Sequence, residues 1–337
     1  MADPLVSVKM ITYNHAPHIA KAIEGVLAQN VRFPIELVIG EDCSTDGTRD
    51  IVCAFQRKHP DVIRVISSET NVGMKKNGYR TLKACRGKYV AFCDGDDYWH
   101  HPGKLQQQAA YMERHPECGL TFSDYDVFHG ASATVTRGFL KQQQWTMPPA
   151  PDIWAFVSRR FPIILTCTVM TRRTLSRQIV DSDPYLHQSE TFLMGDTQHW
   201  MEVAAAAAVH YTPESLATYN QTEESATRSR DIRRMLRFQV SNSEMLIYLC
   251  NKHNAPSHIR RTFEASWRDA SLRLAFHTQN AQLADEVRRK NRRFTRTQWL
   301  LYCGAKNPAL GYPFRFAAAC RNILRGASRE RPQREGS

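Results

Sequence analysis

The sequence predicts an α/β fold, in which a mostly parallel sheet carries helices on both faces, followed by a C-terminal helical extension. Short apolar, β-branched runs alternate with segments of helical period through the first hundred residues. Polar turn residues follow most of these runs, and from residue 231 onward the pattern is almost entirely helical. Strands that alternate with helices form parallel sheets, because each helix carries the chain back to the end from which the next strand starts.

Strands and helices are expected in a regular order along the N-terminal part. The expected strands are 5–11, 35–40, 63–67 and 89–93, and the expected helices are 16–29, 48–58 and 78–85. Further along, residues 119–123 and 163–170 resemble strands, and 194–208 a helix. In the C-terminal part, Asn, Gly and Pro predict breaks between helices near 254–256, 307–308 and 311–313.

Polar side chains gather where three of the expected strands end. The first strand is followed by Thr12, Tyr13 and Asn14, the second by Glu41 and Asp42, and the fourth by Asp94-Gly95-Asp96-Asp97. Open α/β sheets bind their ligands beyond the carboxyl ends of the strands. We therefore expect these three strand ends to meet at one ligand site.

The acidic run Asp94-Gly95-Asp96-Asp97 places three carboxylates within four residues, directly after a buried strand. Such crowding is costly without a cation, and hard oxygen ligands of this kind suit Mg²⁺ or Mn²⁺ shared with substrate phosphates. The alternative is a solvated Asp-Gly turn that ends the strand. On the first interpretation Asp94, Asp96 and Asp97 are candidate metal ligands.

The run from Glu41 to Thr48 combines a strand end with turn residues before a helix. Asp46 or Thr45 could simply cap that helix. Capping does not explain Asp42, whose carboxylate could accept a hydrogen bond from the imide N–H of a uracil-type base.

Charge is distributed unevenly along the 337 residues. Residues 228–337 hold 23 Lys and Arg against 8 Asp and Glu, a net charge of +15, whereas residues 1–227 carry −3. The basic part indicates an acidic partner, such as an anionic membrane surface or nucleic acid, or a well-solvated helical tail.

Other features narrow the functional class and the compartment. The nine cysteines are scattered without a C-x-x-C pair, which favours a reducing cytoplasm. We expect neither a signal peptide nor a membrane-spanning helix. No G-x-S-x-G, Rossmann glycine motif or P-loop is present. The histidine pairs His15/His18 and His100/His101 lack further ligands at zinc-like spacing. Hydrolase, dehydrogenase and NTPase activities therefore have no anchor in the sequence.

Together these motifs resemble glycosyltransferase family 2, whose fold is called GT-A. The resemblance covers about the first 105 residues, through residues 6–14, 41–48, Asn71-Val72-Gly73, Gly87-Lys88-Tyr89 and the acidic run. It implies a nucleoside-diphosphate sugar as donor, with UDP as the nucleotide. Donor-binding residues would then lie at the strand ends and on the following helix. The candidates are Thr12, Tyr13 and Asp42 at the base, Asp94 and Asp96 at the ribose, metal and diphosphate, and Asn14, Lys76 and Arg80.

A second match, Met194 to Glu202, resembles the helix start at which inverting members of the family keep their catalytic base. Asp196 is our candidate, because inverting transfer needs a carboxylate that takes the proton from the attacking acceptor hydroxyl. The alternative is that Asp196 only caps the helix beginning at Thr197. Glu190 and Glu202 are weaker candidates, since Glu202 falls more than a turn inside the helix.

The sequence departs from the family after this helix. Related chains often carry a Tyr-Arg pair and then a His, where this chain has Tyr219-Asn220-Gln221-Thr222. The cation expected at the departing diphosphate is therefore missing from its usual place. Arg228 or Arg230 could supply it, or Lys76 and Arg80 from the other side.

The C-terminal part mixes basic and aromatic residues, as in Arg288 to Phe294 followed by Trp299 to Tyr302. This pattern suits attachment to the inner face of an anionic membrane, or a helical subdomain whose aromatics pack internally. The expected organisation is a catalytic domain at 1–227, a basic helical extension at 228–325 and a disordered tail at 326–337. Within the catalytic domain we expect a donor half at about 1–105 and an acceptor half at about 106–227.

The function predicted from the sequence is inverting, metal-assisted transfer of a sugar from a nucleotide sugar, with Mn²⁺ or Mg²⁺. The acceptor would be a hydroxyl of a glycan or of a lipid-linked glycan. Two alternatives stay open: a catalytically silent protein that only binds the nucleotide sugar, and a nucleic-acid-binding protein that acts through its basic part. Acidic strand ends argue against the second.

Overall fold

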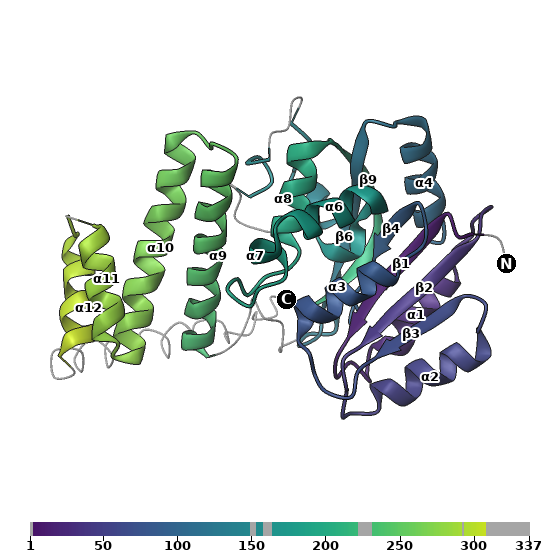
Figure 1. Cartoon of the computed structure of the whole chain (residues 1–337), viewed down its shortest axis with the longest axis horizontal. Coiled ribbons are helices and arrows are strands. Elements are labelled where there is room, and N and C mark those ends of the chain that lie inside the picture. The colour runs from purple at the N-terminus through teal and green to yellow at the C-terminus, as the bar shows by residue number, and fades with distance from the viewer. Residues whose placement is uncertain (1–2, 149–152, 158–163, 222–230, 292, 308–337) are drawn as a thin grey trace, which may run out of the picture. The chain divides into compact units, whose positions relative to one another are not determined.

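A computed structural model describes residues 3–148, 153–157, 164–221, 231–291 and 293–307 (Figure 1). The chain divides into two compact units, Met1–Ser225 and Ala226–Ser337. This division lies two residues from the one predicted at 227. The predicted tail at 326–337 lies outside the described residues, as does the predicted break at 311–313.

The first unit is built on a nine-stranded sheet with the order β3-β2-β1-β4-β8-β6-β9-β5, and β7 pairs with β6 at the side. The first four strands in this order run parallel, as the alternation of strands and helices predicts. β8 turns the sheet antiparallel between β4 and β6. The strands are β1 Val6–Thr12, β2 Ile35–Glu41, β3 Ile63–Ser67, β4 Tyr89–Phe92, β5 Tyr98–Trp99, β6 Cys118–His129, β7 Thr134–Thr136, β8 Met170–Arg172 and β9 Ala208–Gln221.

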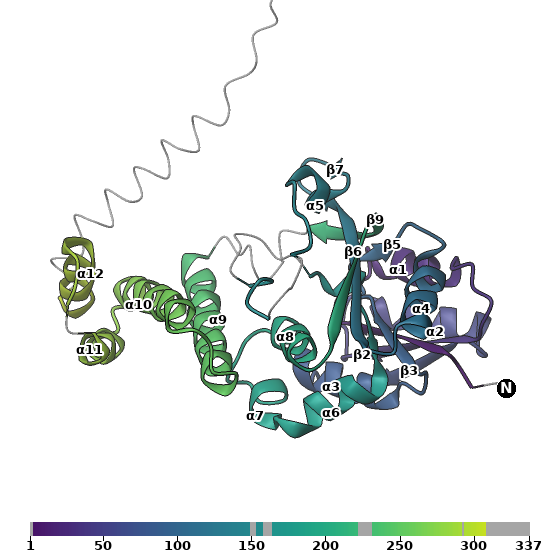
Figure 2. The same cartoon turned by 90° about the horizontal axis from the view of Figure 1, so that it is seen from above.

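Helices cover both faces of this sheet (Figure 2). One face packs its apolar side chains, among them Val8 and Met10, against α1, α2 and α4. The other face, with Val38, Val90 and Phe92, packs against α3, α6 and α8. The helices of this unit are α1 Ile19–Leu27, α2 Thr48–Lys58, α3 Met74–Ala84, α4 Lys104–Arg114, α5 Phe139–Gln142, α6 Arg173–Ser182, α7 Pro184–His187 and α8 Thr197–Ala206.

Several predicted elements differ from the structure: α3 begins four residues before the helix expected at 78–85, and no strand was predicted at β9. The strand expected at 163–170 is wrong, because Thr166–Thr168 form a 3₁₀ turn and the strand β8 begins only at Met170. The helix expected at 194–208 is shorter at both ends. It begins at Thr197, since the carboxylate of Asp196 accepts a hydrogen bond from the N–H of Thr197 and caps the helix there.

The second unit is helical, as predicted. Its helices are α9 Ile232–Lys252, α10 Ser257–Thr278, α11 Ala281–Lys290 and α12 Arg296–Lys306. The predicted break near 254–256 is confirmed, and the break near 307 coincides with the end of α12. A further break lies at Gln279, which adopts a left-handed backbone, and Asn280 then caps α11 through its side chain. The hydrophobic core of the second unit includes Leu236, Trp267 and Leu272. No helix among the described residues has the length and apolarity to cross a membrane.

Lys104 is fully buried on α4 of the first unit. Its ammonium donates to Oε1 of Gln108 at 2.7 Å and lies 4.3 Å from the ring centroid of Trp99. Burial lowers the pKa of Lys104 to about 7. The folded protein therefore binds this proton less tightly than the unfolded chain, so Lys104 destabilises the fold at neutral pH. That cost falls as the pH rises toward 10, where the unfolded lysine also loses its proton.

We expect Lys104→Met to raise the free energy of unfolding at pH 7 by about 1–2 kcal/mol, after the lost Gln108 contact is counted. This advantage should shrink toward pH 10. Urea unfolding of both proteins, followed by tryptophan fluorescence at several pH values, measures the difference. A difference that stays constant with pH would contradict the assignment.

Candidate active site

The ends of β1, β2 and β4 are joined by backbone hydrogen bonds. The N–H of Asp42 donates to the carbonyl of Thr12 at 3.1 Å, and the N–H of Gly95 donates to the carbonyl of Ile11 at 2.9 Å. Thr12 and Glu41 are also partners in the register of the two strands. The predicted meeting of the three strand ends is therefore confirmed.

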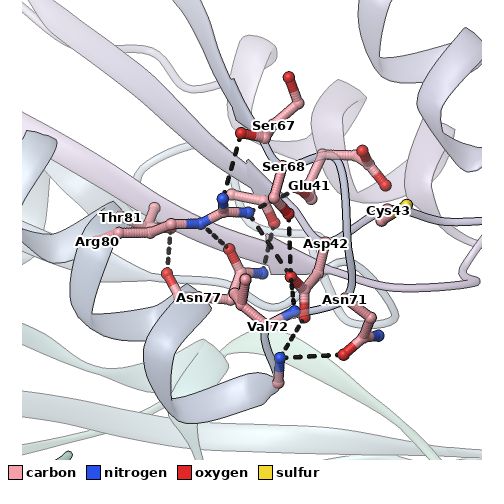
Figure 3. Close-up of polar contacts among 12 residues, drawn as sticks. Glu41, Asp42, Cys43, Ser67, Ser68, Asn71, Val72, Asn77, Arg80 and Thr81 are labelled. Carbon is pink, nitrogen blue, oxygen red and sulfur yellow. Dashed lines mark hydrogen bonds and ion pairs between the residues drawn. The ribbon is translucent and has the colours of Figure 1, made fainter.

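Asp42 is buried directly after β2, and its carboxylate is held by the loop that precedes α3 (Figure 3). Oδ1 accepts hydrogen bonds from the N–H of Val72 at 2.9 Å and from Oγ of Ser68 at 3.3 Å, and Oδ2 accepts from the N–H of Gly73 at 2.9 Å. These donors fix the orientation of the carboxylate and stabilise its charge. The Asn71-Val72-Gly73 segment, noted in the sequence only as a family motif, thus has a structural purpose.

Arg80 on α3 supports Asp42 from the other side. Its guanidinium lies 3.7 Å from Oδ1 of Asp42 and donates to the carbonyl of Glu41 at 2.8 Å. It also donates to Oδ1 of Asn77 and to the carbonyl of Ser67 (Figure 3). The structure thus places Arg80 at the ends of β2 and β3. Lys76 lies on the same helix, exposed, with its ammonium 3.3 Å from the carboxylate of Glu190.

The two residues after Thr12 at the end of β1 differ: Tyr13 is exposed, and Asn14 is held by hydrogen bonds. The side chain of Tyr13 is 43% exposed, unusual for an aromatic residue beside buried acids. Asn14 has a left-handed backbone with φ of 55°, and its side-chain oxygen accepts from the N–H of Thr45 at 2.9 Å. The N–H of Asn14 donates to Oγ of Ser44 at 3.0 Å. Asn14 therefore fastens the end of β1 to the turn after β2, and Tyr13 is left free to contact a ligand.

In the acidic run, Asp94 and Asp96 differ from Asp97. Asp94 and Asp96 are half-buried, and within the described part of the chain their carboxylates make neither a hydrogen bond nor an ion pair. Burial raises the pKa of Asp94 to about 7. The carboxylate of Asp97 is buried, and its Oδ1 accepts a hydrogen bond from the N–H of Asn220 on β9 at 2.9 Å. Burial also raises the pKa of Asp97.

Gly95 keeps this run close to β1. A Cβ at this position would lie 2.7 Å from Oγ1 of Thr12 and 2.9 Å from Nδ1 of His15, so any other residue would force the two strand ends apart. Oγ1 of Thr12 and Nδ1 of His15 are themselves buried without a hydrogen-bond partner among the described residues. Buried polar atoms are usually paired, so these two atoms are suited to contact a bound ligand.

The carboxylates of Asp94 and Asp96 fit a divalent cation that binds together with a substrate phosphate. No group of three or more His, Cys, Asp or Glu able to hold a metal alone occurs among the described residues. Asp94 and Asp96 offer two carboxylates without protein partners next to each other. Mg²⁺ and Mn²⁺ are commonly bound in this way, by one or two carboxylates together with phosphate oxygens and water.

Asp196 caps α8 and lies within electrostatic reach of the acidic run. Its Oδ1 accepts from the N–H of Thr197 at 2.6 Å, and its Oδ2 accepts from Oγ1 of Thr166 at 3.3 Å. Burial is the largest cause of the raised pKa of Asp94, and the charge of Lys9 opposes it. The negative charges of Asp96 and Asp196 raise this pKa further. The capping role is therefore confirmed. Glu202 is buried in the second turn of α8, and the side chain of Glu190 is 81% exposed.

Asn220 lies at the position where the family resemblance led us to expect a cation. Its N–H is bonded to Asp97, and its side-chain Nδ2 lies 3.1 Å from Nδ1 of His18. The position thus links β9 to the acidic run and to the segment before α1. Arg228 and Arg230, the predicted replacements, lie outside the described residues.

Lys9 was not predicted as a site residue from the sequence, yet its charge and those of Asp94 and Asp196 act on one another. The signal was present, because Lys9 interrupts the run Val6-Ser7-Val8 to Met10-Ile11 in the middle of a mostly buried strand. A lysine is seldom placed in such a strand, even half-buried, without a reason.

Comparison with known proteins identifies the family. The sequence model described as Glycosyl transferase family 2 matches residues 7–180. The uncharacterised protein Rv1520 of Mycobacterium tuberculosis is 32% identical over 221 residues, so the chain covers 58% of that relative's length. These residues are 64% of this chain. WfaP of Escherichia coli, described as a UDP-Glc:alpha-D-GlcNAc-diphosphoundecaprenol beta-1,3-glucosyltransferase, is 25% identical over 69% of this chain and 83% of its own.

A solved structure shows the same fold. Residues 1–349 of TarS from S. aureus, crystallised with UDP-GlcNAc, align with a TM-score of 0.55 and 20% identity, over 93% of this chain and 92% of that one. The mixed sheet with helices on both faces is thus a GT-A fold. Since the family model covers more than half of its residues, the chain belongs to glycosyl transferase family 2.

Proposed function

We propose that this protein transfers a sugar from a nucleoside-diphosphate sugar to an acceptor hydroxyl, with inversion at the anomeric carbon and with the help of Mn²⁺ or Mg²⁺. One observation carries the proposal. The unpartnered carboxylates of Asp94 and Asp96 stand at a strand end beside the oriented carboxylate of Asp42, and Asp196 lies within electrostatic reach of them. Donor-binding and proton-accepting groups are thereby brought to one edge of the sheet.

The nucleotide would bind at the ends of β1 and β2. Asp42 is oriented by backbone N–H groups and Arg80, which prepares it to accept the imide N–H of uracil. The exposed ring of Tyr13 is available for stacking on the base. UDP is the nucleotide named for two of the comparison proteins, WfaP and TarS, and this supports UDP here.

The diphosphate would bind at the acidic run, where a bound divalent cation would neutralise the departing charge. Asp94 and Asp96 are the proposed ligands, together with phosphate oxygens and water. Asp97 was a third candidate, yet its carboxylate is engaged by β9. We therefore assign to Asp97 the task of holding the run in place. Lys76 remains a proposed contact for the diphosphate, whereas Arg80 acts through Asp42.

In the proposed reaction Asp196 takes the proton from the acceptor hydroxyl. The acceptor oxygen forms its bond to the anomeric carbon as the bond from that carbon to the diphosphate oxygen breaks, and the electron pair leaves with the diphosphate. The capping bond from Thr197 and the contact with Thr166 fix the carboxylate of Asp196 for this task. Capping and catalysis are therefore compatible roles of one side chain.

The acceptor is proposed to be a glycan or a lipid-linked glycan, as the name of WfaP indicates for that relative. The basic helical unit would bring the enzyme to an anionic membrane surface that carries such acceptors. Within this unit the guanidinium of Arg288 lies 5.2 Å from the ring of Phe294 and 4.9 Å from that of Trp299. Trp299 and its neighbour Leu300 are 41% and 47% exposed. Exposed apolar side chains beside arginines suit the boundary between headgroups and acyl chains.

The metal assignment predicts different behaviour for two neighbouring acids. UDP with Mn²⁺ should stabilise the wild-type protein by about 2–3 kcal/mol at a hundred times the dissociation constant, and more than UDP alone. Asp96→Asn should lose the Mn²⁺-dependent part of this thermal shift. Asp97→Asn should keep it, because an amide oxygen still accepts from the N–H of Asn220. The reverse order in the two variants would move the metal to Asp97.

Asp196→Asn should lower kcat by about 10²–10⁴-fold while the affinity for the donor stays close to that of the wild type. The asparagine still caps α8, so the fold should be retained. Turnover is measured as UDP released from a UDP-sugar in the presence of acceptor and Mn²⁺. Glu24→Gln, a change at an exposed acid of α1, is the control and should leave turnover within about twofold. Wild-type turnover in Asp196→Asn would exclude it as the base.

Vesicle flotation tests the membrane surface. The wild-type protein should bind vesicles rich in phosphatidylglycerol at low salt. It should dissociate from them at roughly 0.5 M salt, because salt at that concentration screens the attraction between surface charges. Replacing both Trp299 and Leu300 with Ser should weaken binding by about tenfold. Val135→Ser, at an exposed apolar residue of β7, is the control and should have no effect. Binding to duplex nucleic acid with no binding to vesicles would favour the nucleic-acid alternative instead.

Measuring turnover of the UDP-sugar also distinguishes an active enzyme from a protein that only binds the nucleotide sugar. A protein that binds UDP-sugar with Mn²⁺ but neither transfers nor hydrolyses it would support the silent alternative.

A further inference from the structure

Lys9 lies in the middle of β1 with its side chain on the face of the sheet that α3 covers. Its strand neighbours Val8 and Met10 point to the opposite face, into the core with α1. The ammonium of Lys9 is 5.3 Å from the ring centroid of Phe92 on β4, and a Cβ on Gly78 of α3 would lie 3.4 Å from it. Gly78 thus leaves room for the end of the lysine side chain.

The ammonium of Lys9 has no hydrogen-bonding or ion-pairing partner within the described residues. It makes no hydrogen bond there, and no carboxylate oxygen approaches it within 4.0 Å. Burial lowers the pKa of Lys9, against the charges of Asp94, Cys85 and Asp196, which raise it. Lys9 is half-buried, and its ammonium has three N–H donors that no acceptor of the described residues satisfies. A ligand that enters between Asp94 and Asp196 would supply the missing acceptors.

Lys104 shows what a structural buried lysine looks like in the same unit. It donates to Gln108 at 2.7 Å and lies against the ring of Trp99, so protein groups on α4 and β5 partly offset the cost of burying its charge. Lys9 has only the ring of Phe92 within reach, and the carboxylates that act on it are those of the proposed site. The contrast distinguishes a lysine that serves packing from one that is available to substrate.

The position of Lys9 indicates which part of the nucleotide sugar it would contact. The diphosphate is assigned to Asp94 and Asp96, and the acceptor hydroxyl to Asp196. The anomeric carbon must stand between the departing diphosphate oxygen and the attacking oxygen, so the transferred sugar lies between these groups. Lys9 is in register with Phe92 on β4, and Asp94 follows Phe92 by two residues and so lies on the same face of the sheet. We therefore place the sugar ring on this face beside the ammonium of Lys9, whereas the base is held at the far ends of β1 and β2.

We propose that Lys9 is a donor-binding residue whose ammonium donates hydrogen bonds to oxygens of the transferred sugar, so that it selects the sugar and contributes little to binding of the nucleotide. The inference rests on the proposed function and assigns a substrate contact to a residue of the first strand.

Calorimetric titration of the full chain with UDP and with UDP-glucose or UDP-N-acetylglucosamine, each with Mn²⁺, tests the assignment. Lys9→Met should weaken binding of the preferred UDP-sugar by about 10–100-fold, the effect of a lost hydrogen bond to a charged group. The same variant should change binding of UDP by less than about twofold. In steady-state turnover, the donor KM should rise and the KM for acceptor should change little.

Lys104→Met is the matched control, because it removes another buried ammonium from the same unit. It should leave the ratio of UDP-sugar to UDP affinity unchanged. Circular dichroism and thermal melting check the fold of each variant, and Lys9→Gln, which keeps two N–H donors, replaces Lys9→Met if the latter does not fold.

Two results would overturn the assignment of Lys9: an unchanged affinity for the UDP-sugar, or an equal loss of UDP and UDP-sugar binding in a folded variant. If the wild-type protein bound no nucleotide sugar at all, the proposed function itself would fail, and the assignment with it. Wild-type binding therefore tests the function, and the ratio in Lys9→Met tests the residue.

Discussion

Three backbone hydrogen bonds at the ends of β1, β2 and β4 determine the geometry of the site. They run from Asp42 to the carbonyl of Thr12, from Gly95 to that of Ile11 and from Cys93 to that of Lys9. Neighbouring strands stand about 4.8 Å apart, so side chains that follow them are brought within reach of one small molecule. A shift of β4 by one residue would turn Asp94 to the opposite face and bring a side chain against Thr12 in place of Gly95. The register of the sheet therefore decides which groups a donor meets.

The acids gathered at this edge are stabilised in different ways. Glu41 is paired with Arg49, and Asp42 is held by two backbone N–H groups and Arg80. Asp97 is bonded to β9. These contacts are made by the fold itself, so all three carboxylates have protein partners before any ligand binds. Asp94 and Asp96 lack such contacts, and their mutual repulsion favours a cation between them and a phosphate. Acids with protein partners are thus held in a fixed orientation, and the two acids without them are the proposed metal ligands.

Local signals in the sequence were sufficient for the parallel half of the sheet and for the cap of α8. Each of β1 to β4 is an apolar run that ends in turn residues, and Asp196 precedes an evident helix start. β8 escaped prediction because it is three residues long and is defined by antiparallel pairing with β4 and β6, which are distant in sequence. Arg80 was expected at the diphosphate, yet its partners on β2 and β3 come from other segments. Periodicity within a window carries no information on such contacts.

Several unsatisfied polar groups lie at one edge of the first unit. Oγ1 of Thr12 and Nδ1 of His15 are buried without hydrogen-bond partners, and nearby the half-buried carboxylates of Asp94 and Asp96 and the ammonium of Lys9 lack a hydrogen bond or ion pair among the described residues. Folding alone would select against this arrangement, because each unpaired buried group reduces stability. These groups lie beside the strand ends, where α/β folds bind ligands. The loss of stability is therefore explained by ligand binding. A nucleotide sugar offers a base, phosphate oxygens and sugar hydroxyl groups, which match the kinds of polar group that β2, β1 and β4 bring to this edge. The edge is therefore complementary to a ligand that the fold cannot replace with its own side chains.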